Sequence, residues 1–160
     1  MKKTVLFLCL FLFSVVFFQN HVFAKEQKIY VLPPEKIASY INATKGQRRA
    51  LVFYASWCPA CRKKIPDLMD MERAKAGSII AVSEDKNRSN FARYIKKFDD
   101  VPFKIIISNP DGGSTLLNAV RKFGVKPWNS YPTIVLIDEN NRAVKQGYLP
   151  SKEIANFLFQ

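Results

Sequence analysis

Cys58 and Cys61, two cysteines three positions apart, are the residues best suited to chemistry in this 160-residue chain. They follow an apolar, strand-like run at 50–55 and open a helix-like run at 59–76. At a helix N-terminus the unpaired N–H groups and the helix dipole stabilise a thiolate, so we expect Cys58 to be nucleophilic near neutral pH. Cys61, one turn further on, can then attack the mixed disulfide and release the partner. The spacing therefore predicts a dithiol that cycles with a disulfide.

The neighbours of the pair are expected to set its reactivity. Pro59 and Ala60 lie between the cysteines, where they influence thiolate stability and hence the reduction potential. Arg62, Lys63 and Lys64 add positive charge that also favours a thiolate. We expect Lys63 and Lys64 to be exposed on the helix, so their electrostatic effect is incidental.

The first 24 residues have the order of a secretory signal peptide. Lys2 and Lys3 precede an apolar run at 5–18, and short side chains occupy the positions that a signal peptidase reads. The run is short for a bilayer span, which needs about 20 residues, although an uncleaved N-terminal anchor is the alternative. Either case places the domain at 25–160 outside the cytoplasm, in the periplasm or an equivalent compartment.

Removal of this segment leaves few reactive side chains. Cys9 and His21 both precede the cleavage point, so the mature domain has Cys58 and Cys61 and no histidine. A Cys–His hydrolase is excluded, and two thiolates without imidazole make a poor metal site, so we expect no metal. A structural disulfide is disfavoured because so small a loop constrains little of the unfolded chain.

The formal net charge of +12 comes from basic residues scattered along the chain. Scattered basicity indicates a solvated surface, with some attraction to acidic partners or to anionic lipid headgroups. No basic–aromatic motif is present, so nucleic acid is not an expected partner.

Apolar runs and turn residues predict alternating strands and helices, with Phe53 and Tyr54 in the core. Ser151 is expected to cap the last helix. This order indicates a central mixed β-sheet with helices on both faces. The expected strands are 28–32, 50–55, 78–82, 103–107, 133–137 and 143–149, and the expected helices are 35–43, 59–76, 90–98, 114–123 and 151–159, with a turn at 110–113.

The motif Trp57-Cys-Pro-Ala-Cys61, with Pro66 beyond it, resembles the active site of thioredoxin-fold proteins. Tyr131-Pro132 before an apolar strand is similar to the second half of that signature. The resemblance implies that Pro132 is cis and faces the dithiol, and that the backbone of Tyr131 pairs with an extended substrate segment. Trp57 would shield the dithiol or contact partners, and the Tyr131 side chain would line the partner groove or pack beneath it.

The strand–helix block at 78–98 and the turn at 109–113 resemble the insertion of the TlpA-like, cytochrome c maturation (CcmG/DsbE-type) branch. One departure is Val52, at the position where thioredoxin has a buried acid that assists proton transfer. Glu84 and Asp85 are weak substitutes, because acids just past a strand are more often solvated.

The sequence thus predicts an exported thioredoxin-fold enzyme that reduces disulfides of partner proteins. The resemblance implies a membrane electron donor, cytochrome c apoprotein clients and no bound organic cofactor. One alternative is a periplasmic oxidase that donates its disulfide to folding proteins. Another, from a different class, is a chaperone-like binding module whose dithiol is incidental.

Overall fold

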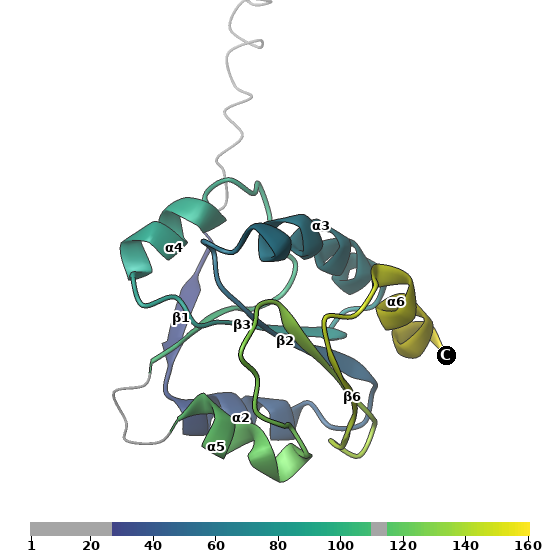
Figure 1. The fold of residues 1–160 in the computed structure, drawn as a ribbon. Helices are drawn as coiled ribbons and strands as arrows, with labels where there is room; N and C mark the ends of the chain where they lie inside the picture. The colour runs from purple at the N-terminus through teal and green to yellow at the C-terminus, as the bar shows by residue number, and fades with distance from the viewer. Residues whose placement is uncertain (1–26, 110–114) are drawn as a thin grey trace, which may run out of the picture.

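The computed structural model describes residues 27–109 and 115–160, and within them six strands form one sheet in the order β1-β4-β3-β2-β5-β6 (Figure 1). The signal peptide expected at 1–24 and the turn at 110–113 lie outside the described residues. The strands are β1 (Ile29–Leu32), β2 (Arg49–Tyr54), β3 (Ile79–Ser83), β4 (Ile105–Ser108), β5 (Thr133–Ile137) and β6 (Ala143–Gly147).

The strand β2 lies inside the sheet, between β3 and β5. It runs parallel to β3 and antiparallel to β5, and all six of its residues are buried. Val52 and Tyr54 contribute to the core on one face, while Leu51 and Phe53 contribute to the core on the other. A strand covered on both faces has no polar side, which explains the continuous apolar run in the sequence.

Helices cover both faces of the sheet, as Figure 1 shows. One layer consists of α3 (Pro59–Ala74), α4 (Arg88–Ile95) and α6 (Ser151–Phe159). The other consists of α2 (Pro34–Ala43), α5 (Leu116–Val120) and the 3₁₀ turn η1 (Arg121–Phe123). None of the helices within the described ranges has the length and apolar character that crossing a bilayer requires.

The structure confirms the predicted thioredoxin-like α/β class, a mixed sheet in which β4 lies between β1 and β3. Phe53 and Tyr54 are core residues, as expected. The helix expected at 114–123 is split, because α5 ends at Val120 and the chain tightens into η1. Gly124 then ends the segment with φ of 84°, a left-handed conformation that glycine adopts without steric cost.

The cap predicted for the last helix is wrong. Pro150 is the N-cap of α6 and Ser151 is its first residue. The Ser151 hydroxyl instead donates to Asp67 Oδ2 and accepts from Lys64 Nζ at 2.7 Å, so it joins α6 to α3. A side chain that has partners in another helix is not available to cap its own.

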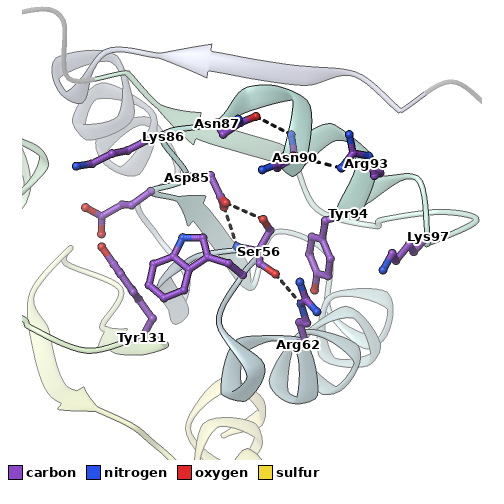
Figure 2. Close-up of a pocket in the computed structure, with 12 residues that line it drawn as sticks. Ser56, Arg62, Asp85, Lys86, Asn87, Asn90, Arg93, Tyr94, Lys97 and Tyr131 are labelled. Atoms are coloured by element: carbon purple, nitrogen blue, oxygen red, sulfur yellow. Dashed lines mark hydrogen bonds between the residues drawn. The ribbon is translucent and has the colours of Figure 1, made fainter.

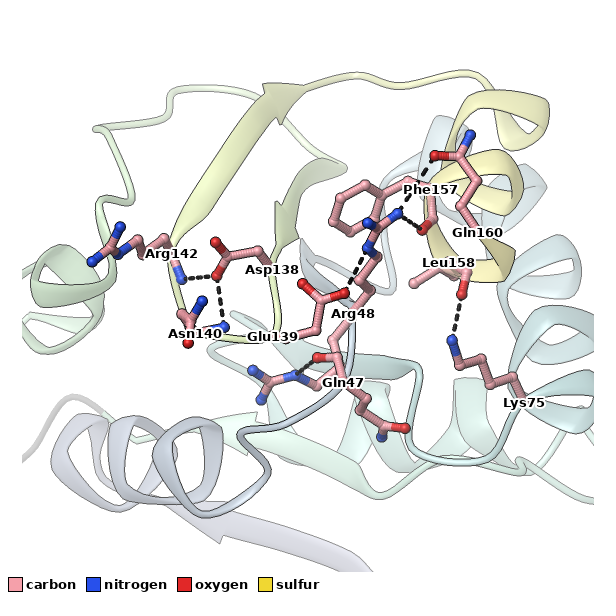
Figure 3. A network of polar contacts seen from close by, with 11 residues as sticks. Gln47, Arg48, Lys75, Asp138, Glu139, Asn140, Arg142, Phe157, Leu158 and Gln160 are labelled. Carbon is pink, nitrogen blue, oxygen red and sulfur yellow. Dashed lines mark hydrogen bonds and ion pairs between the residues drawn. The ribbon is translucent and has the colours of Figure 1, made fainter.

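Polar contacts at the opposite end of α6 hold its C-terminus to the sheet (Figure 3). Arg48 Nε pairs with Glu139 at 2.9 Å, and its Nη1 donates to the side chain of Gln160 at 3.4 Å. Its guanidinium also lies 5.3 Å from the centre of the Phe157 ring. Arg48 thus connects the start of β2, the turn after β5 and the last helix.

Candidate active site

Cys58 is the N-cap residue of α3, and its sulfur takes the place of a capping side chain. The backbone of Cys58 is extended, Pro59 is the first helical residue, and Cys58 Sγ accepts a hydrogen bond from the Cys61 N–H at 3.3 Å. This N–H is one of the donors that a helix leaves unpaired at its start. The sulfur therefore lies where both the helix dipole and a directed hydrogen bond favour negative charge.

Cys61 is in a different environment although it is only one turn away. It is 1% exposed, and Cys58 is 6% exposed; both are free thiols. Burial raises the pKa of Cys61 to about 12, and side-chain hydrogen bonding with Cys58 acts in the same direction. Cys61 therefore holds its proton at neutral pH, so the two sulfurs are chemically distinct.

The segment before β5 brings a second part of the predicted site to Cys58. The Tyr131–Pro132 peptide bond is cis, as the resemblance implied. Cys58 Sγ donates to the carbonyl oxygen of Tyr131 at 3.3 Å. Trp57, which is 63% exposed, lies edge-on to the Tyr131 ring with 5.9 Å between ring centres. The structure thus brings Trp57, Cys58, Tyr131 and Pro132 together.

The two residues between the cysteines differ in burial. Pro59 is exposed at the start of α3, whereas Ala60 is partly buried against the core cluster that contains both cysteines. Pro59 therefore faces solvent, whereas Ala60 adjoins the core that surrounds the two sulfurs.

Asp85, two residues after the end of β3, is buried, so the expectation that it is solvated is wrong. Its carboxylate accepts from the Ser56 N–H at 2.7 Å, from the Ser56 hydroxyl at 2.6 Å and from the Ser83 hydroxyl at 2.6 Å. These contacts fix the backbone two residues before Cys58. Ser56 follows β2, and Ser83 ends β3, the parallel neighbour of β2. Serines at the ends of two adjacent strands are the sequence signal that could have identified this hydrogen-bonded cluster.

Glu84 is half-buried and holds in place the segment that leads to Pro132. It accepts from Trp128 Nε1 at 2.9 Å, and the Trp128 ring is stacked on Phe53 with 4.1 Å between ring centres. Burial raises the pKa of Glu84, and hydrogen bonds from Trp128 and Tyr131 oppose that shift. Burial also raises the pKa of Tyr131 to about 12, to which the charge of Glu84 adds. Trp128 was not among the predicted site residues.

Lys64 is buried, and the expectation that it is exposed is wrong. Its ammonium donates to Ser151 Oγ at 2.7 Å and lies 5.4 Å from the centre of the Tyr148 ring. Lys63, its neighbour, is exposed as expected. Lys64 therefore joins α3 to the C-terminal segment.

A cysteine pair is the main candidate for metal binding, yet within 27–109 and 115–160 no group of three or more His, Cys, Asp or Glu side chains could hold an ion.

Comparisons with known proteins agree with this geometry. The thioredoxin-like family model matches residues 46–143. Tryparedoxin of Trypanosoma brucei brucei is 32% identical over 110 residues, which are 65% of this chain and 69% of tryparedoxin. The thiol-disulfide oxidoreductase ResA of Bacillus thuringiensis is 27% identical over 105 residues, which are 64% of this chain and 55% of ResA. The chain thus spans about half the length of ResA.

Solved structures with the same fold include a DsbE-type thiol:disulfide interchange protein from Chlorobium tepidum. It is 26% identical, with a TM-score of 0.55, over 74% of this chain and 82% of that one. The exposed lipoprotein thioredoxin Etrx1 of Streptococcus pneumoniae is 27% identical, with a TM-score of 0.53, over 74% and 88% of the two chains. The match to the family model and the named activity of these relatives show that the chain belongs to the thioredoxin-like family, as a protein thiol–disulfide oxidoreductase.

Proposed function

We propose that the chain is exported and reduces disulfides of partner proteins, with Cys58 as the attacking thiol and Cys61 as the resolving thiol. The observation that carries the proposal is the asymmetry of the two sulfurs. Cys58 Sγ caps α3 and faces the Tyr131 carbonyl, whereas Cys61 is buried and its pKa is raised to about 12. One sulfur is arranged to start the reaction and the other to finish it.

The reaction has two exchange steps. The Cys58 thiolate attacks one sulfur of the partner disulfide, which forms the Cys58–partner bond and releases the other partner sulfur as a thiolate that takes up a proton. Cys61 then loses its proton and attacks Cys58 Sγ, so the Cys58–Cys61 disulfide forms and the second partner thiol leaves. Two electrons pass from the dithiol to the partner, and a dithiol protein must reduce the enzyme again; we assign that role to a membrane electron donor.

The same geometry supports roles for the neighbouring residues. The Tyr131 carbonyl accepts from Cys58 Sγ, so a partner strand that pairs with the Tyr131 backbone would reach the sulfur. Pro132 would hold that backbone in place, and exposed Trp57 would contact the partner. Pro59 and Ala60 would tune the reduction potential.

Export rests on the signal-peptide pattern of residues 1–24, with peripheral or N-terminal membrane attachment if the segment is retained. The reducing direction rests on the resemblance of the motifs around Cys58, Cys61 and Pro132 to the cytochrome c maturation branch. We propose cytochrome c apoprotein thiols as clients because of the resemblance to the cytochrome c maturation branch.

The reduction potential of the Cys58–Cys61 pair tests the direction of electron flow. Equilibration of the full-length protein against glutathione or dithiothreitol should give a value near or below about −200 mV, as for thioredoxin-like reductants. A value near about −120 mV would identify a disulfide donor instead. Cys61→Ser should trap the mixed disulfide with a partner, whereas Cys58→Ser should abolish exchange.

A further inference from the structure

A cavity of about 540 Å³ lies beside the dithiol, between the Ser56–Trp57 loop, α4 and Tyr131 (Figure 2). Trp57 and Tyr131 line it, and both also adjoin Cys58. A partner segment that reaches Cys58 can therefore continue into this cavity. We call it the α4 groove.

The α4 groove is lined by four cationic side chains: Arg62, Lys86, Arg93 and Lys97. All four are exposed; in Figure 2 Arg93 projects from α4, Lys97 lies in the turn after it, and Arg62 comes from α3. Their hydrogen bonds are to uncharged groups: Arg62 Nε donates to the Ser56 carbonyl at 2.6 Å and Arg93 Nη1 to Asn90 Oδ1 at 3.3 Å. Across the described ranges, none of the four forms an ion pair with a carboxylate.

The two carboxylates that line the groove are already occupied. Asp85 accepts two hydrogen bonds from Ser56 and one from Ser83, and Glu84 accepts from Trp128 and Tyr131. Those contacts hold both carboxylates against neighbouring protein groups, so neither carboxylate binds the cationic side chains of the groove. The groove therefore keeps an excess of positive charge beside the reactive sulfur.

The Tyr94 hydroxyl gives a second, independent indication of a ligand. Tyr94 lines the groove and is 7% exposed, yet its hydroxyl has no hydrogen-bond partner. The Arg62 guanidinium lies 5.8 Å from the centre of its ring, next to it in Figure 2. Native proteins pair most buried polar atoms, and an unpaired one indicates a missing partner. A carboxylate would accept from Tyr94 and attract Arg62 at once.

We propose that the α4 groove binds an acidic segment of the protein substrate next to its disulfide, so that the enzyme prefers disulfides flanked by Asp or Glu. This inference rests on the proposed disulfide reduction and names the substrate class for that site. Positive charge beside the sulfur raises the association rate of an acidic partner, and Tyr94 with Arg62 fixes one carboxylate near Cys58.

The test uses the reduced full-length protein and two disulfide-bonded peptides that differ only at three flanking positions, Glu in one and Gln in the other. At low ionic strength kcat/KM should be at least ten-fold higher for the Glu peptide. The difference should shrink strongly at 0.5 M salt, about the range at which exposed charges are screened. The Arg93→Gln/Lys97→Gln variant should reduce the Glu/Gln ratio several-fold.

The matched control is Lys36→Gln/Lys45→Gln, which removes the same charge from exposed positions on and after α2, under the opposite face of the sheet. This control should keep the ratio. Equal losses of the ratio in both double variants would overturn the inference, because net charge and not the groove would then be responsible. A Glu/Gln ratio of one in the unmodified protein, with both peptides reduced, would overturn the groove inference and leave the proposed disulfide reduction standing.

Two further outcomes separate the sources of failure. If neither peptide is reduced, the proposed function fails and the inference fails with it. If glutathione disulfide, a small acidic disulfide, loses reactivity in the groove variant while the Glu peptide does not, the groove serves small molecules and the peptide assignment is wrong.

Discussion

Asp85 accepts hydrogen bonds from both the backbone N–H and the hydroxyl of Ser56, at 2.7 and 2.6 Å. One carboxylate thereby fixes the loop that presents Trp57 and Cys58. It also accepts from Ser83 at the end of β3, so the loop is tied to the strand next to its own. The position of the reactive sulfur depends on a residue 27 positions further along the sequence.

Asp85→Asn should lower both stability and activity. An amide nitrogen would face donors where a carboxylate oxygen now accepts, which leaves buried hydrogen bonds unmade at about 1–3 kcal/mol. Urea unfolding should show a loss of that size, and disulfide reduction should slow because the loop before Cys58 loosens. Asp99→Asn, at an exposed acid, is the control and should change the free energy of unfolding by less than about 0.5 kcal/mol. Equal effects at the two sites would refute the role of Asp85.

The two thiols should differ in their reaction with iodoacetamide. At pH 7–8 alkylation should occur at Cys58, because the pKa of Cys61 is raised to about 12 and its thiol remains protonated and buried. Mass spectrometry of partly alkylated protein measures the ratio of the two adducts. Predominant modification of Cys61 would reverse the assignment of attacking and resolving thiols.

The same burial predicts a pH dependence of stability. The pKa of Cys61 in the folded state lies above its ordinary value of 9.0, so the unfolded chain ionises first. The contribution of Cys61 is complete below pH 9 and is lost as the pH rises toward 12. Urea midpoints at pH 8 and pH 10.5 should fall more in the unmodified reduced protein than in Cys61→Ser, which cannot ionise. Parallel slopes in the two proteins would contradict the burial effect.

Tyr94→Phe should leave the free energy of unfolding unchanged or raise it by up to about 1 kcal/mol, because the buried hydroxyl has no partner to lose. The same variant should reduce the preference for acidic peptides. Urea unfolding and the Glu/Gln peptide ratio measure the two effects. A stability loss above about 1 kcal/mol would show that the hydroxyl is paired in the free protein.

Adjacent lysines give a matched pair of variants. Lys64→Ala should destabilise the protein by about 1–3 kcal/mol, because Ser151 loses a charged hydrogen-bond donor and the buried stem leaves a cavity. Lys63→Ala, at an exposed position, should stay within about 0.5 kcal/mol. Chemical unfolding of both variants decides the matter; similar losses would show that Lys64 has no special structural role.

Short sequence patterns were sufficient to predict the candidate redox site. The spacing of Cys58 and Cys61, the apolar strand before them and the Tyr131-Pro132 motif each carry their own signal. The sheet brings these motifs together because β2 and β5 are antiparallel neighbours. Burial on both faces of β2 leaves little freedom for an alternative arrangement.

The wrong expectations all concern polar residues whose partners lie far away in the chain. The sequence predicts Asp85 and Lys64 to be solvated and Ser151 to be a helix cap, because a local sequence pattern does not show their distant partners. Arg49 is a similar case. It is fully buried at the start of β2, where its Nη2 donates to Asn141 Oδ1, 92 positions further along the chain. Tertiary contacts decide whether such charges are buried.

The pairing of β2 with β5 also has a consequence for biosynthesis. Cys58 and Tyr131 are 73 residues apart in sequence, and they meet only when β5 docks beside β2. Non-local strand pairing forms late because the loop between the strands must close first. During synthesis the two thiols therefore leave the ribosome well before the carbonyl that will contact Cys58. In that interval the nascent chain carries both cysteines without the contact between Cys58 and Tyr131.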